Sequence, residues 1–353
     1  MAYMTSKMIE WWTKFQPFTE DELMLREKLC SDNIDYSKIT AEELHDYLSC
    51  QNQLFDAMPW TENIRNSYNF YFTPSCTDAI DSLFDKYVDD HTLVITTSLE
   101  HPSVLANLEK CKHVVVLDYP ESTLRVSNSF IKRVHDKVSK HINDTLFTDM
   151  NKVFIYVVGT YVAYSNIHSN AMIQDLANVA SRFITEDNIT TVLDDCQGMF
   201  LVPRDYSMFD FVLCTSHAIT RLDSGIILSN KQVVGTQALE PISKLIERLQ
   251  PVLDRRYKLS LFREIMSQYF DQYRGKFQVI EQDVAASHIF SMIDKDKLLG
   301  EEEIKLLEKY GIRVDGENTD MQILRFRAMH FLFFPEELLS GLILLEELLQ
   351  EVY

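Results

Sequence analysis

The chain has 353 residues, 46% of them hydrophobic, which is enough to bury a sizeable core and predicts two subdomains. Its 53 acidic and 34 basic residues give a formal charge of −19, and such a surface disfavours general binding to nucleic acids or anionic membranes. No apolar run reaches the roughly 18 residues that a transmembrane helix needs.

The N-terminus and the cysteines predict a cytoplasmic protein. Residues 1–12 contain no basic region followed by an apolar stretch, so no secretory signal is expected. The cysteines are scattered, without a Cys-x-x-Cys pair or the spacing of metal ligands, which favours a reduced compartment and no structural zinc. They are Cys30, Cys50, Cys76, Cys111, Cys196 and Cys214.

The first fifty residues are helical by pattern. Helices are expected at 20–30 and at 41–52. We expect the segment 1–50 to pack against a small domain formed by the C-terminal part of the chain.

Residues 51–235 predict an α/β domain, because short apolar β-rich runs alternate with amphipathic helical patterns. The expected strands are 93–97, 113–117, 153–158, 191–193, 211–214 and 225–228. The expected helices include 77–87, 130–141 and 171–183. Strands that are apolar along their whole length indicate a mostly parallel sheet covered on both faces, which gives three layers.

Residues 236–353 predict a smaller α+β domain. The pattern is helical over 237–273, and two β-rich runs, 287–292 and 323–326, flank a helix at 301–310. The last element is an amphipathic helix over 335–350 with a proline in its first turn.

Three segments carry the most specific pattern: Thr191–Gln197, Phe209–Ala218 and Gly225–Asn230. They resemble the class V aminotransferase and cysteine desulfurase-like branch of fold-type-I enzymes, which depend on pyridoxal 5'-phosphate (PLP). In that family a strand ending in Asp-x-x-Gln precedes a strand ending in Ser-His-Lys or Ser-x-His-Lys, and a Gly-led strand follows. The resemblance implies the fold-type-I three-layer sheet with a small α+β domain.

The family's lysine position is occupied by Ala218. That lysine forms a Schiff base with the cofactor, so the usual route of the family is closed to this chain. The residue is either an engineered replacement in an active enzyme or a natural loss.

The resemblance implies that Asp194 pairs with the pyridine nitrogen of PLP and that Gln197 donates to the phenolic oxygen of the ring. The neighbouring Asp195 is expected to point the other way. The alternative for Asp194 is a carboxylate that caps a turn.

Residues 72–80 resemble the phosphate cradle of the family, a turn that opens a helix and offers its free N–H groups. The implied cofactor contacts are Ser75, Cys76 and Thr77, although Ser75 stands where the family has glycine. The alternative is an ordinary helix start capped by Thr73 or Ser75.

Further site residues follow from the same resemblance. Ser216 and His217 match the phosphate contacts before the lysine, and His101 matches the imidazole that stacks on the ring and can shuttle a proton. Arg325, with Arg327 as the fallback, matches the arginine that takes the substrate carboxylate. The alternatives are a structural histidine and arginines that cover the surface of the small domain.

The absence of a cysteine after Cys214 disfavours sulfur transfer through a persulfide, because desulfurases carry the attacking cysteine beyond the lysine position. The resemblance therefore implies a homodimeric transferase-like protein that acts on the amino group of a small amino acid or amine, of the aminotransferase, lyase or epimerase type. The alternative is a catalytically degenerate protein with a binding, scaffold or regulatory role.

Overall fold

A computed structural model describes two compact units, one within residues 53–250 and the other within 253–351. The expected domain boundary at 235/236 and the helices expected at 20–30 and 41–52 lie outside the described residues. The described residues are 53–58, 63–65, 67–98, 100–117, 132, 136–137, 139–140, 150–161, 166–167, 174, 177–178, 180–181, 184–196, 198–201, 204–215, 225–231, 249–250, 253, 259–271, 277–279, 289–294, 299–310, 312–315, 322–327 and 335–351.

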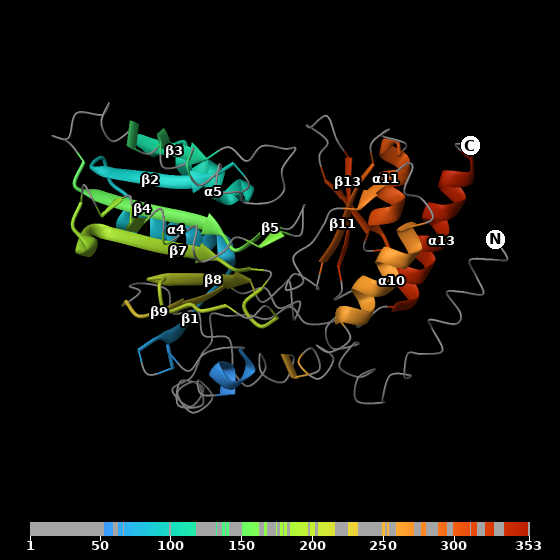
Figure 1. The fold of residues 1–353 in the computed structure, drawn as a ribbon, viewed down its shortest axis with the longest axis horizontal. Helices are drawn as coiled ribbons and strands as arrows, with labels where there is room; N and C mark the ends of the chain where they lie inside the picture. The colour runs from blue at the N-terminus through green and yellow to red at the C-terminus, as the bar shows by residue number, and fades with distance from the viewer. Residues whose placement is uncertain are drawn as a thin grey trace. The chain divides into compact units, whose positions relative to one another are not determined.

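The first unit is built on a seven-stranded sheet with the strand order β1-β9-β8-β7-β4-β2-β3 (Figure 1). Strands β3, β2, β4, β7 and β8 are parallel, whereas β9 pairs antiparallel with both β8 and β1. The expected mostly parallel sheet is confirmed. The strands are β1 (Asn69–Thr73), β2 (Thr92–Thr97), β3 (His113–Leu117), β4 (Lys152–Val158), β7 (Ile189–Asp194), β8 (Phe211–Thr215) and β9 (Gly225–Ser229).

Helix α4 (Cys76–Tyr87) covers one face of this sheet. Its buried side chains Ile80, Leu83 and Phe84 lie at helical spacing, and burial of each contributes about 1.5–3 kcal/mol. They pack against a cluster from β2, β4, β7, β8 and β9 that includes Phe154 and Tyr156. Helix α5 (Pro102–Leu108), which the sequence pattern did not predict, adds one buried valine to the same cluster.

The remaining described elements of this unit are short. They are β5 (Thr160–Tyr161), β6 (Asn166–Ile167) and the 3-10 helix η1 (Glu186–Asn188). The helices expected at 130–141 and 171–183 lie mostly outside the described residues.

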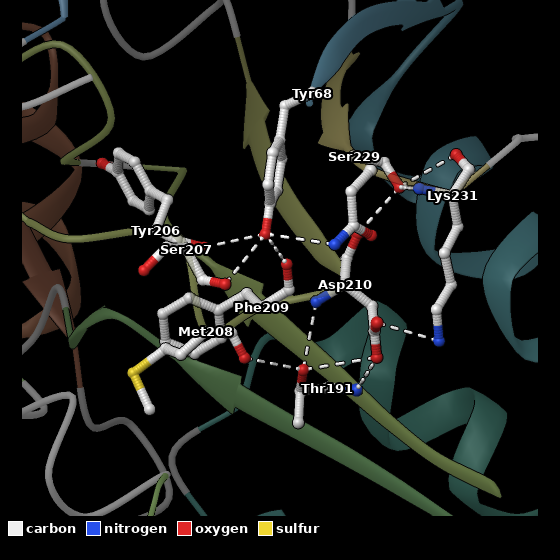
Figure 2. A network of polar contacts seen from close by, with 10 residues as sticks. Tyr68, Thr191, Tyr206, Ser207, Met208, Phe209, Asp210, Ser229 and Lys231 are labelled. Carbon is white, nitrogen blue, oxygen red and sulfur yellow. Dashed lines mark hydrogen bonds and ion pairs between the residues drawn. The ribbon is translucent and has the colours of Figure 1, made fainter. Parts of the chain in front are cut away.

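The amino ends of β7 and β8 are joined to β9 by a network of polar contacts (Figure 2). Asp210 accepts hydrogen bonds from the backbone N–H of Thr191 at 2.9 Å and pairs with Lys231 at 2.8 Å. The Tyr68 hydroxyl lies 2.7 Å from the carbonyl oxygen of Phe209, and burial and the nearby Asp210 raise its pKa to about 12. The network fixes the end of the sheet opposite the carboxyl ends of its parallel strands.

The second unit contains a four-stranded antiparallel sheet with the order β10-β11-β13-β12. Tyr269 and Phe270 of α10 contact this core: Phe270 packs on Phe290 and Phe326, and Tyr269 donates a hydrogen bond to the Leu342 carbonyl at 3.1 Å. The elements are α10 (Leu259–Asp271), β10 (Phe277–Val279), β11 (Ile289–Asp294), α11 (Glu301–Glu308), β12 (Ile312–Asp315), β13 (Gln322–Arg327) and α13 (Pro335–Glu351). The final helix and both expected strands are present; β10 and β12 were not expected.

None of the described helices is both long enough and apolar enough to cross a membrane.

Gly225 opens β9 at a point where a neighbouring turn passes close by. A Cβ atom at Gly225 would lie 2.3 Å from Thr73 Oγ1 and 2.5 Å from the Ser75 carbonyl oxygen. The turn is held there because Thr73 Oγ1 donates to that same carbonyl at 2.6 Å. The start of α4 is therefore fixed against the first residue of β9.

We predict that Gly225→Ala lowers the free energy of unfolding by about 3 kcal/mol, because the backbone of the turn must move to admit the methyl group. Chemical denaturation measures this change. Ile226→Val, at a fully buried position of the same strand, is the control and should cost only about 1 kcal/mol. Equal losses for the two variants would contradict the close approach.

Candidate functional site

Acidic side chains gather at the carboxyl edge of the parallel strands. Glu100 follows β2, while Asp194 ends β7 and Asp195 comes directly after it. All three are buried, with exposed fractions of 5%, 4% and 0%. Ligands of open α/β sheets bind outside the carboxyl ends of the strands, so this edge is the candidate site.

Among the described residues, Asp194 is held by two hydrogen bonds. The Tyr156 hydroxyl donates to its Oδ2 at 3.0 Å, and the backbone N–H of Cys196 donates to its Oδ1 at 3.1 Å. Burial and the charge of Asp194 hold the pKa of Tyr156 well above its usual range, so the phenol remains a donor. Within the described ranges, no lysine, arginine or histidine forms an ion pair with Asp194.

Asp195 has a different set of partners. Tyr206 donates to its Oδ2 at 2.6 Å, and the Arg204 Nε lies 3.9 Å from the same oxygen. Arg204 also donates to the Gly159 carbonyl at 3.0 Å. Burial raises the pKa of Asp195, and Arg204 and Tyr206 oppose that shift. This carboxylate therefore has its charge partner within the protein and ties the loop after β7 to the end of β4.

Glu100 is the third carboxyl group, and the resemblance did not single it out. Its Oε1 accepts from the Thr97 hydroxyl at 2.6 Å and from the Val158 N–H at 3.2 Å. Its Oε2 is buried without a hydrogen-bond partner among the described residues. Burial first, and the charge of Asp194 in addition, raise its pKa to about 8. This shift favours the protonated form of Glu100 at neutral pH.

The start of α4 is brought to this site. Cys76, its first residue, lies with its Sγ 3.1 Å from the Sγ of Cys196, two residues after Asp194. Ser75 caps the helix: its Oγ accepts from the Asp78 N–H at 3.1 Å and donates to the Asp78 carboxylate at 2.6 Å. The side chain of Thr77 is exposed. The observed contacts of Ser75 are thus those of a helix cap, as in the alternative interpretation. Asp78 adds negative charge to the turn where a phosphate was expected.

His101 caps the next helix. It is exposed, and its Nδ1 accepts from the Ser103 N–H at 3.3 Å and lies 2.7 Å from the Ser103 hydroxyl. Through these contacts the imidazole caps the N-terminus of α5. The stacking role of His101 stays a prediction.

Other expected site residues cannot be placed. Gln197, Ser216, His217 and Ala218 lie outside the described residues. Arg325 belongs to β13, where its backbone lies opposite Ser291 and Arg313. The side chains of Arg325 and of the fallback Arg327 are not described, so their role stays a prediction.

Three contributors to the site escaped the sequence pattern: Glu100, Tyr156 and Cys196. Of these, only Glu100 could have been found from the sequence, since it follows a predicted strand and directly precedes His101. In the part of the chain that the structure describes, no cluster of three or more histidine, cysteine or acidic side chains is arranged to hold a metal ion.

Comparison with solved structures relates the chain to three kinds of protein. A NifS-like protein from Rickettsia africae aligns with a TM-score of 0.65 at 11% identity, covering 96% of this chain and 97% of that one. Serine palmitoyltransferase from Sphingomonas wittichii aligns with a TM-score of 0.63 at 13% identity, covering 95% and 84%. A SepCysS–SepCysE N-terminal domain complex aligns with a TM-score of 0.61 at 11% identity, covering 95% and 92%.

In sequence, no protein-family model and no curated protein matches the chain. At 11–13% identity the structural likenesses establish the fold alone. The expected fold class is confirmed: the chain has the fold of the fold-type-I PLP-dependent enzymes.

We predict that protonated Glu100 makes the fold more stable at acid than at neutral pH. Its folded-state pKa of about 8 lies above the ordinary value of 4.5, so its contribution is complete below pH 4.5 and is lost as the pH rises through 8. Glu100→Gln keeps an acceptor for Thr97 and Val158 and cannot ionise. Urea unfolding at several pH values should show a fall of a few kcal/mol over this window that is smaller in the variant. Identical slopes in the two proteins would contradict the buried neutral acid.

Proposed function

We propose that this chain binds PLP at the carboxyl edge of the seven-stranded sheet and acts on the amino group of a small amino acid or amine, without the lysine of the resembling family. One observation carries the proposal. Asp194 is buried and hydrogen-bonded, yet has no cationic side chain beside it in the described part of the chain. A protonated pyridine nitrogen is a cation of suitable shape, and the carboxylate would keep it protonated.

The residues present fit the two ends of the cofactor unequally. Asp194 fits the ring nitrogen well. At the start of α4, the N–H groups of Cys76 and Thr77 have no carbonyl partner within the helix and suit a phosphate. The Ser75 hydroxyl is already used by Asp78, so this end of the site binds a phosphate less strongly than an uncapped glycine turn would.

When bound, PLP supplies an electron sink for the α-carbon of an amino acid. Ala218 has no amine to hold the cofactor covalently or to move the α-proton, so binding depends on Asp194 and on the phosphate contacts. Glu100 contributes a neutral carboxyl group beside Asp194. The negative charge at this edge of the sheet is therefore small enough for a single cation to balance. The resemblance also leads us to propose a homodimer and a role for Arg325 toward a substrate carboxylate.

The second candidate is a binding or regulatory protein that turns nothing over. It is favoured by the contacts of Ser75 and His101, because both side chains are engaged as helix caps rather than directed at a ligand.

We predict saturable and reversible binding of PLP to the purified chain in equilibrium dialysis. Asp194→Asn should weaken this binding by about ten- to a hundredfold, because a charge-assisted hydrogen bond contributes about 1.5–3 kcal/mol. Asp195→Asn is the matched control, since its carboxylate is directed to Tyr206 and Arg204. It should reduce stability and leave PLP binding within about threefold. Equal losses would mean that the wrong carboxylate was chosen, and no saturable binding would reject the proposal.

A second prediction concerns the missing amine. Ala218→Lys should give a covalent PLP adduct that borohydride reduces and that mass spectrometry maps to position 218. A partly desolvated lysine near bound PLP has a lowered pKa, which leaves enough neutral amine to react. Thr220→Lys is the control and should give no adduct at its own position. If Ala218→Lys gives none either while PLP still binds, the pocket has closed around position 218, and the non-catalytic candidate is the better one.

A further inference from the structure

Two cysteines from distant parts of the chain meet beside Asp194. Cys76 is the first residue of α4 and Cys196 lies in the turn after β7, 120 residues further on, yet their Sγ atoms are 3.1 Å apart. Both side chains are half-buried rather than sealed in the core. A third cysteine, Cys214 of β8, is fully buried, and its Sγ lies 4.0 Å from the Cys196 carbonyl oxygen.

The separation of the two sulfur atoms is close to that of a bond. A disulfide has an S–S length of about 2.05 Å, so the sulfur atoms need to approach by only about 1 Å. The reduced pair is therefore already positioned for oxidation.

The surroundings give the two thiols different roles. Cys76 is the first residue of a helix of 12 residues, with Asp78 in the same turn. The hydrogen bond with Cys76, burial and the charge of Asp194 raise the pKa of Cys196, which keeps that sulfur as a thiol. This difference leaves Cys76 as the nucleophile of the pair.

We propose that Cys76 and Cys196 form a reversible intramolecular disulfide when the protein meets a peroxide. The Cys76 sulfur attacks one peroxide oxygen, so that an S–O bond forms, the O–O bond breaks and hydroxide leaves as water after taking the thiol proton of Cys76. The Cys196 thiol then attacks the oxidised sulfur, the S–S bond forms and a second water leaves. In all, two thiols lose two electrons to one hydrogen peroxide, and a dithiol reverses the bond by exchange.

The disulfide would join the first turn of α4 to the turn that carries the Asp194 contacts. Because Cys196 donates its N–H to Asp194, the bond acts on the carboxylate of the candidate site through one residue. The proposal goes beyond the proposed function and does not depend on it, since the bond forms in the chain without a cofactor.

Peptide mapping tests the proposal directly on the full-length chain. Trypsin places Cys76 in peptide 66–86, Cys196 in peptide 183–204 and Cys214 in peptide 205–221, with one cysteine in each. After brief treatment with a small molar excess of hydrogen peroxide and alkylation of the remaining thiols, we expect 66–86 linked to 183–204. The linked mass should be two hydrogens below the sum of the peptides and should disappear with dithiothreitol. The intact protein should stay at the mass of one chain.

Variants separate this pair from other thiol chemistry. Cys76→Ser and Cys196→Ser should each abolish the linked species, and the wild-type map stands if either variant fails to fold. Cys111→Ser is the matched control, because Cys111 is also half-buried and its Sγ donates a hydrogen bond to the Asn107 carbonyl rather than to another cysteine. It should leave the yield unchanged. A link between 183–204 and 205–221, or sulfinic acid at Cys76 without any link, would overturn the proposal.

Discussion

The burial of three carboxyl groups at one edge of the large sheet is the constraint on which the rest of the site depends. Each buried charge costs several kcal/mol of lost hydration, and like charges at short range add to that cost. The three carboxyl groups differ in what offsets this cost. Asp195 has Arg204, Glu100 keeps its proton, and Asp194 has two hydrogen bonds.

Asp194 is therefore the carboxylate of the three that has no cationic partner among the described residues. Two hydrogen bonds to a charged group contribute about 3–6 kcal/mol gross, which offsets part of the hydration lost but supplies no opposite charge. An apolar residue at the same place would avoid this cost altogether. The cation of the proposed cofactor is an arrangement that would make the observed side chain favourable.

The loss of the lysine bears on affinity and on chemistry separately. A few charge-assisted contacts at about 1.5–3 kcal/mol each are opposed by an association cost of about 4–15 kcal/mol, so affinity without a covalent tether is weak to moderate. Proton movement at the substrate is a different matter, because Ala218 has no group that can accept one.

The sequence predicted the sheet well and its polar edge only in part. Strands β2, β7 and β8 each contain a run of apolar, β-branched or aromatic residues, so their pattern is recognisable without tertiary contacts. Strand β1 was missed because it is a short edge strand that gains its pairing from β9. The raised pKa of Glu100 depends on its burial and on the charge of Asp194, which is distant in the sequence, and no local pattern records such surroundings. The same holds for Cys76 and Cys196, which only the folded sheet brings together.

The described contacts of Asp194 do not require a lysine at position 218. Tyr156 and Cys196 hold it from β4 and from its own turn, and neither contact involves position 218. The presence of this carboxylate alone therefore says nothing about turnover. The proposed function rests instead on the absence of a cationic side chain beside Asp194 among the described residues, because a buried carboxylate without an opposite charge is costly to keep.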